Sequence, residues 1–212
     1  MTAFGLTAQV QAQESRVKDW SYRAEVFGLF GNGRLYNGDN LWGSGLEYGG
    51  GIGVRPFSGW MKRIGFEFEG AHFKSSRTTR SISVFQNQTM DVSTFRNLDS
   101  RLLQGSVLYH FRSGTRMQPF GSIGIGRLNA NYSFECVNCI FDVQPGTGAL
   151  IPRESKSEYR GGKTGITFGG GLKFAINRHL SVRSQAQWVG MSAGSGINLD
   201  ALRFQLGLGV HF

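Results

Sequence analysis

Residues 202–212, LRFQLGLGVHF, alternate between large apolar side chains and polar or small ones. Successive side chains of a β-strand point to opposite faces, so such a strand has one wholly apolar face. That face carries Leu202, Phe204, Leu206, Leu208, Val210 and Phe212. A strand of about 11 residues, tilted by ~45°, is long enough to cross the hydrocarbon core of a membrane. The rest of the chain must decide whether the apolar face meets lipid or a protein core.

The same two-residue alternation occurs in seven earlier segments. They are residues 20–30, 46–54, 64–73, 101–111, 119–132, 165–176 and 180–189. In the segment 119–132 the apolar residues stand at odd positions up to Ile125 and at even positions from Leu128. This change predicts a β-bulge near Gly126. Long connections (31–45, 74–100, 133–163 and 190–200) alternate with short turns. The pattern predicts an all-β protein, an eight-stranded antiparallel up-and-down β-barrel with short turns at one rim and long loops at the other.

The polar face of the predicted strands indicates which side of the barrel meets lipid. It carries charged residues of both signs among many glycines: Arg23, Glu25, Glu47, Glu67, Glu69, Lys173, Arg183 and Arg203. The interior of an eight-stranded barrel is only wide enough for side chains, and such a set could fill it and pair internally. The sequence therefore predicts a transmembrane barrel with an interior charge network. A soluble lipocalin-like ligand carrier, with the apolar face inward, is the alternative.

The end of the chain resembles the C-terminal signal of bacterial outer-membrane proteins. In that pattern a polar residue, a glycine and alternating hydrophobic residues lead to a terminal aromatic, as Gln205, Gly207, Val210 and Phe212 do here. Residues 18–212 as a whole resemble the eight-stranded OmpA/OmpX-type barrels. The resemblance implies integral insertion in the bacterial outer membrane and recognition of the last strand by the assembly machinery. We expect no periplasmic peptidoglycan-binding domain after Phe212.

The N-terminal residues carry a sign of targeting. Val10-Gln11-Ala12 fits the small-x-Ala cleavage pattern of a secretory signal, but the apolar stretch before it is short. Residues 1–12 are therefore interpreted as a truncated signal peptide, with an unstructured tail as the alternative.

The formal net charge of +9 is unevenly distributed. A basic group falls at the predicted short turns: Arg55, Lys62, Arg63, Arg112, Arg116 and Arg178. We expect these side chains to contact anionic phospholipid headgroups. A second group in the loop 74–100, formed by Lys74, Arg77, Arg80 and Arg96, is expected to meet lipopolysaccharide phosphates. The sequence shows no basic helix or zinc-ligand pattern, so nucleic acid is not an expected partner.

Few residues suggest catalysis or cofactor binding. Cys136 and Cys139 are expected to form a small disulfide in the longest outer loop. His179-Leu180-Ser181 resembles the His-x-Ser element of outer-membrane lipid A deacylases, but it falls at a short turn, the wrong rim for that reaction. His72, His110 and His211 lack metal-ligand spacing. We therefore predict no enzyme activity, metal or cofactor.

The functional prediction is a monomeric outer-membrane barrel with a plugged polar interior. Its role would be structural, in envelope integrity, or surface binding through the long outer loops, whose ligand the sequence does not identify. A narrow channel for ions or small solutes is the first alternative, and a lipid-modifying enzyme is less favoured.

Overall fold

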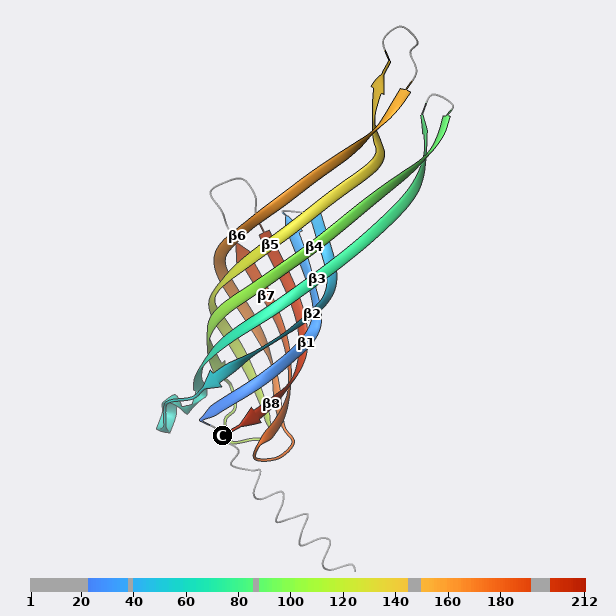
Figure 1. The fold of residues 1–212 in the computed structure, drawn as a ribbon. Coiled ribbons are helices and arrows are strands. Elements are labelled where there is room, and N and C mark those ends of the chain that lie inside the picture. The colour runs from blue at the N-terminus through green and yellow to red at the C-terminus, as the bar shows by residue number, and fades with distance from the viewer. Residues whose placement is uncertain (1–22, 38–39, 86–87, 145–149, 192–198) are drawn as a thin grey trace, which may run out of the picture.

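Eight antiparallel strands close into a barrel in which each strand pairs with its neighbours in chain order (Figure 1). The computed structural model describes residues 23–37, 40–85, 88–144, 150–191 and 199–212. The strands are β1 (Ala24–Asn37), β2 (Asn40–Val54), β3 (Ile64–Phe85), β4 (Gln88–His110), β5 (Met117–Val143), β6 (Leu150–Ala175), β7 (Leu180–Met191) and β8 (Leu199–His211), and a 3₁₀ helix, η1 (Gly59–Arg63), precedes β3. The predicted eight-stranded fold is confirmed. The predicted signal peptide, residues 1–12, lies outside the described residues.

The barrel closes through pairing of the first and last strands. β1 and β8 are antiparallel from Glu25 opposite His211 to Asn37 opposite Leu199. The backbone NH of Phe212 also donates to the carbonyl of Ala24, at 2.9 Å. Closure leaves the barrel without a free sheet edge, as a strand structure in lipid requires. No helix among the described residues is long and apolar enough to cross a membrane.

The outward face of the barrel is apolar and exposed, as the alternation predicted. Phe30, Phe68, Phe204 and Leu206 are 52–64% exposed, whereas Glu25 and Arg183 are buried at 1%. We call the outward set the apolar belt; its members include Val26, Phe30, Ile52, Phe66, Phe68, Leu103, Val107, Ile123, Ile125, Ile166, Phe168, Leu172, Phe204, Leu206 and Leu208. A soluble barrel would place these side chains inside, so the lipocalin-like alternative is wrong. The barrel spans a membrane with the apolar belt in lipid.

At one end of the barrel, the strands are much longer than the sequence predicted. Residues 74–100 and 133–163, predicted as loops, largely continue β3 to β6. β3 and β4 remain paired up to Phe85 opposite Gln88, and β5 and β6 up to Val143 opposite Leu150. The two hairpins rise beyond the barrel on one side (Figure 1). We call their projecting residues, 74–85, 88–99, 131–143 and 150–160, the outer sheet, and the opposite end of the barrel, with residues 55–63, 111–116 and 176–179, the short-turn rim.

The predicted bulge at Gly126 is absent. Gly126 pairs in register with Gln104 on one side and with Gly165 on the other. The parity change arises because Ile123 and Ile125 face outward while Leu128 and Ala130 face the lumen, where they are 5% and 1% exposed. Apolar residues therefore switch from lipid to the barrel interior along this strand without a slip of register.

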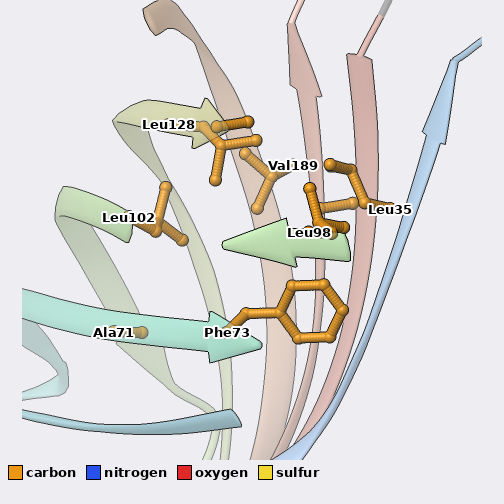
Figure 2. Packing of buried hydrophobic residues seen from close by; sticks show 9 residues of the cluster. Leu35, Ala71, Phe73, Leu98, Leu102, Leu128 and Val189 are labelled. Carbon is orange, nitrogen blue, oxygen red and sulfur yellow. The ribbon is translucent and has the colours of Figure 1, made fainter. Parts of the chain in front are cut away.

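The outer half of the lumen holds an apolar plug rather than the polar filling that was predicted. The plug consists of Leu35, Ala71, Phe73, Leu98, Leu102, Leu128, Ala130, Val189 and Ala201. Figure 2 shows Leu102, Leu128 and Val189 gathered above Phe73. Leu35 and Val189 are 1% and 0% exposed, so the plug excludes solvent as a soluble protein core does.

Candidate functional site

Below the plug, the lumen is filled by charged side chains from six strands. Lys173 of β6 donates to Glu25 Oε2 of β1 at 2.6 Å and to Glu67 Oε1 of β3 at 2.7 Å. Arg183 of β7 holds the other oxygen of Glu67 at 2.9 Å. The guanidinium carbon of Arg183 also lies 4.1 Å from the centre of the Phe27 ring, a cation–π contact. Glu67 is thus shared by two cations.

A second part of the network lies nearer the plug and depends on a single cation. Arg203 of β8 donates through Nε to Glu47 Oε1 at 2.6 Å, and its Nη2 pairs with Glu69 Oε1 at 2.5 Å. Its Nη1 donates to Gln187 Oε1 at 2.6 Å. Gln104 Nε2 donates to the second oxygen of Glu69, at 2.9 Å. Arg203 therefore balances two buried carboxylates.

The two parts of the network are joined by glutamines. Gln185 Oε1 accepts from Arg183 at 2.6 Å, and its Nε2 donates to Gln205 Oε1 at 2.5 Å. Gln205 in turn donates to Glu47 at 3.2 Å. We call the charged residues Glu25, Glu47, Glu67, Glu69, Lys173, Arg183 and Arg203, with these glutamines, the ionic layer. Between the ionic layer and the plug, around Glu47 and Arg203, the cavity is only about 20 Å³, about the space of one water molecule.

The structure brings together seven of the eight residues predicted for this network and corrects the eighth. Arg23 is exposed and precedes β1 at the short-turn rim, because the strand begins one residue later. Arg55, predicted as a lipid contact, instead faces the lumen at 6% exposure and donates to Gln118 Oε1 at 2.8 Å. Its parity matches that of Glu47, and this signal could have placed it in the interior. The predicted alternating segment ends at residue 54, so Arg55 was assigned to the short turn.

The four residues of the C-terminal pattern divide between the two faces of β8. Gln205 is buried in the ionic layer, whereas Val210 and Phe212 are 42% and 73% exposed on the lipid side. At Gly207 an added Cβ would lie 2.7 Å from the Leu29 side chain and 3.2 Å from Cγ of Arg183. Glycine is therefore needed where β8 passes the ionic layer. Recognition of this strand by the assembly machinery stays a prediction.

The remaining basic residues of the short turns lie where they were predicted. Lys62, Arg63, Arg112, Arg116 and Arg178 are all exposed at the short-turn rim. Arg63 Nη1 donates to the hydroxyl of Tyr109 at 3.3 Å. Their contact with phospholipid stays a prediction.

The predicted outer basic group is divided by the sheet. Alternation along β3 places Lys74 and Arg80 on the face that continues the apolar belt. Arg77 and Arg96 point to the opposite, lumen-side face and are direct neighbours across β3 and β4. Arg96 also lies 5.6 Å from the centre of the Phe134 ring.

The charged residues of β6 in the outer sheet differ from the arginines of β3 and β4, because they pair with one another. Lys156 Nζ lies 2.9 Å from Glu158 Oε1, and Arg160 Nη2 lies 3.8 Å from Glu158 Oε2. The hydrogen bond and charge of Lys156 lower the pKa of Glu158, and those of Glu158 raise the pKa of Lys156. No ion pair of Arg77, Arg80 or Arg96 is found within the described part of the chain.

The two cysteines lie in a strand bulge rather than in a loop. Cys136 and Cys139 are joined, with Cα atoms 5.7 Å apart. β5 pairs with β6 at Cys136 and resumes at Ile140, so the intervening residues loop out of the ladder. Asn138 has a φ of 62°, the left-handed region that asparagine tolerates better than most residues.

His179 and Ser181, the pair considered for catalysis, do not assemble. His179 is exposed at the short-turn rim, whereas Ser181 is buried and its Oγ lies 2.7 Å from Nε2 of His211. His110 is buried on the lumen side of β4, and its Nδ1 lies 3.2 Å from the carbonyl oxygen of Arg63. Within the described ranges, no group of three or more histidine, cysteine or acidic residues could hold a metal ion.

Comparison with known proteins agrees with this architecture. Residues 1–212 match the family described as outer membrane protein beta-barrel domain. The Neisserial surface protein A has a similar structure, with a TM-score of 0.56 and 12% identity over 89% of this chain and 97% of its own. OprG from Pseudomonas aeruginosa has a TM-score of 0.50 and 10% identity over 92% and 98% of the two chains. No curated protein matches the sequence. Since the family match covers the whole chain, the protein belongs to the outer membrane protein beta-barrel family and is an integral protein of the outer membrane.

Proposed function

We propose that the protein is a non-enzymatic, monomeric surface-binding protein whose barrel anchors the outer sheet outside the cell. The ligand would carry sulfate, phosphate or carboxylate groups. The observation that carries the proposal is the pair of arginines, Arg77 and Arg96, held directly opposite each other on a rigid sheet without an acidic partner among the described residues.

The outer sheet is stiffer than a set of loops. β3, β4, β5 and β6 are joined by continuous pairing, and β4 and β5 stay paired as far as Ser93 opposite Val137. β2 pairs with β3 only up to Phe73 and β7 pairs with β6 only from Ile166, so the sheet rises beyond the other four strands. A hydrogen-bonded sheet holds side chains in fixed relative positions, which lowers the entropy lost when a ligand binds.

Two like charges opposite each other on adjacent strands destabilise a sheet. An anionic group between Arg77 and Arg96 would remove this repulsion and accept hydrogen bonds from two guanidinium groups. The Phe134 ring beside Arg96 restricts the movement of that side chain. These features together favour binding of an anionic ligand at the lumen-side face of the outer sheet.

Binding to a polyanion tests the proposal. Purified protein in lipid nanodiscs should be retained on dextran sulfate beads and not on uncharged dextran, and added salt should release it. The variant Arg77→Gln/Arg96→Gln should bind about tenfold more weakly, because it loses charge-assisted hydrogen bonds to the sulfate groups.

The matched control is Lys156→Gln/Arg160→Gln, which removes the same charge from the same sheet at positions already paired with Glu158. It should change retention by less than about twofold, since paired surface charges contribute little. Equal losses in the two variants would mean that only net charge matters, and the proposed site would be wrong. Absence of retention of the unaltered protein would contradict an anionic ligand.

A further inference from the structure

A pocket of about 400 Å³ opens at the short-turn rim between η1 and the end of β4. Its lining consists of Gly59, Lys62, Arg63, Ile64 and Tyr109. Gly59 has a φ of 66°, a conformation that favours glycine and turns the chain into η1. The hydrogen bond from Arg63 to the Tyr109 hydroxyl, at 3.3 Å, holds one cation against the pocket wall. Lys62 and Arg63 are both exposed there.

The rim around this pocket is basic and lacks acidic side chains. The short-turn rim together with the described residues that flank it, which makes the ranges 23–24, 55–64, 111–117 and 176–180, includes no aspartate or glutamate. Its exposed cations are Arg23, Lys62, Arg63, Arg112, Arg116 and Arg178. Among the described residues, these cations therefore have no acidic side chain at the rim to pair with. At a membrane surface the available anions are lipid headgroups.

The pocket also adjoins the apolar belt. Tyr109 and Phe111 are 44% and 57% exposed, and their rings meet edge to face with centres 5.4 Å apart. Phe66 is 40% exposed and its ring contacts Phe57 with centres 6.1 Å apart. A molecule that places an anion at Lys62 and Arg63 would therefore have aromatic and aliphatic surface directly beside it. A phospholipid has this combination of a charged headgroup and apolar chains.

We propose that this pocket is a binding site for the phosphodiester headgroup of an anionic phospholipid in the periplasmic leaflet. Lys62 and Arg63 contact the phosphate, Tyr109 positions Arg63, and the acyl chains lie along Phe66, Tyr109 and Phe111. The site is at the end of the barrel opposite the outer sheet, so this inference does not depend on the proposed function. The proposed site uses one pair of cations, Lys62 and Arg63, of the several that the rim carries.

Native mass spectrometry of the full chain can test the site. The protein would be placed in nanodiscs containing equal amounts of phosphatidylglycerol and phosphatidylcholine with the same acyl chains. The unaltered protein should retain phosphatidylglycerol preferentially. Lys62→Gln/Arg63→Gln should bind it about 30-fold more weakly, since each cation at an anionic lipid surface contributes about fivefold. Tyr109→Phe keeps the ring but removes the acceptor for Arg63, and should weaken binding about threefold.

The control, Arg112→Gln/Arg116→Gln, removes the same charge from the same rim outside the pocket. It should change phosphatidylglycerol retention by less than about twofold. Equal losses in the two double variants, or no loss in either, would overturn the proposal. Displacement of the lipid by inorganic phosphate would identify a site for free anions and would also overturn it. A heat-dependent shift on gels confirms that each variant is folded, and Tyr109→Phe provides the test if a double variant does not fold.

Discussion

Replacing Arg203 with methionine should lower the free energy of unfolding by about 3–5 kcal/mol, the usual cost of removing one partner from a buried ion pair. Arg203 is 3% exposed and its guanidinium group bonds to Glu47, Glu69 and Gln187. Without it, two buried carboxylates would lie close together without the cation that balances them. Lys173→Met should cost less, because it removes the bonded cation from one buried carboxylate, Glu25, whereas Glu67 would still be held by Arg183. Urea unfolding of the protein in lipid vesicles measures both changes.

Two variants show whether the loss comes from uncompensated charge. Arg112→Met removes an exposed arginine at the short-turn rim and should change the stability by no more than about 0.5 kcal/mol. The triple variant Arg203→Met/Glu47→Gln/Glu69→Gln removes the buried charges together and should recover most of the lost stability. If Arg203→Met were as mild as Arg112→Met, the ionic layer would not be a structural element of the barrel.

Replacing Leu206 with arginine should destabilise the protein by about 2–4 kcal/mol, the cost of a cation facing lipid near the middle of the membrane. Leu206 is 64% exposed and lies midway along β8, between Phe30 of β1 and Ser184 of β7. A barrel with this face in water would tolerate the same substitution easily. The result therefore tests which face of the barrel meets lipid.

Ile82→Arg is the matched control for this experiment. Ile82 is also a large exposed aliphatic residue, at 70%, but it belongs to the outer sheet beyond the apolar belt. Its replacement should change stability by no more than about 0.5 kcal/mol, since the side chain stays in water. Equal costs at both positions would argue against a membrane boundary between them.

The outward face of the barrel could be predicted from the sequence because lipid requires every side chain that it touches to be apolar. Phe204, Leu206 and Leu208 follow each other on one parity, and the structure exposes all three. The inward face has no such uniform requirement. Phe27 and Leu29 share the parity of Glu25, and Leu102 shares that of Gln104, and all of them are buried. The buried apolar residues of the lumen, Leu102 of the apolar plug among them, therefore could not be recognised by separating polar from apolar faces.

The outer sheet was missed for a related reason. Residues 74–82 are mostly exposed on both faces, so neither the odd nor the even positions need to be apolar, and the alternation that indicates a strand disappears. The strand is held by backbone pairing with β4, from Lys74 opposite Asp99 to Phe85 opposite Gln88. The direct opposition of Arg77 and Arg96 depends on this register, which side-chain pattern alone does not set. The sequence thus predicted basic residues in this region without identifying which of them face each other.

The interior of the barrel is closed, and we propose that the protein acts through its surfaces rather than through its lumen. The ionic layer and the apolar plug fill successive levels of the interior, and the cavity between them is about 20 Å³. A narrow channel would need a continuous polar path through both.

Conductance of the purified, unaltered protein in planar lipid bilayers tests that claim most directly. The closed lumen predicts no steady current above that of the bare bilayer at any applied voltage that the bilayer withstands, with insertion verified by the heat-dependent shift of protein recovered from the same lipid. Uniform, reproducible conductance steps from inserted protein would contradict it and would favour a channel.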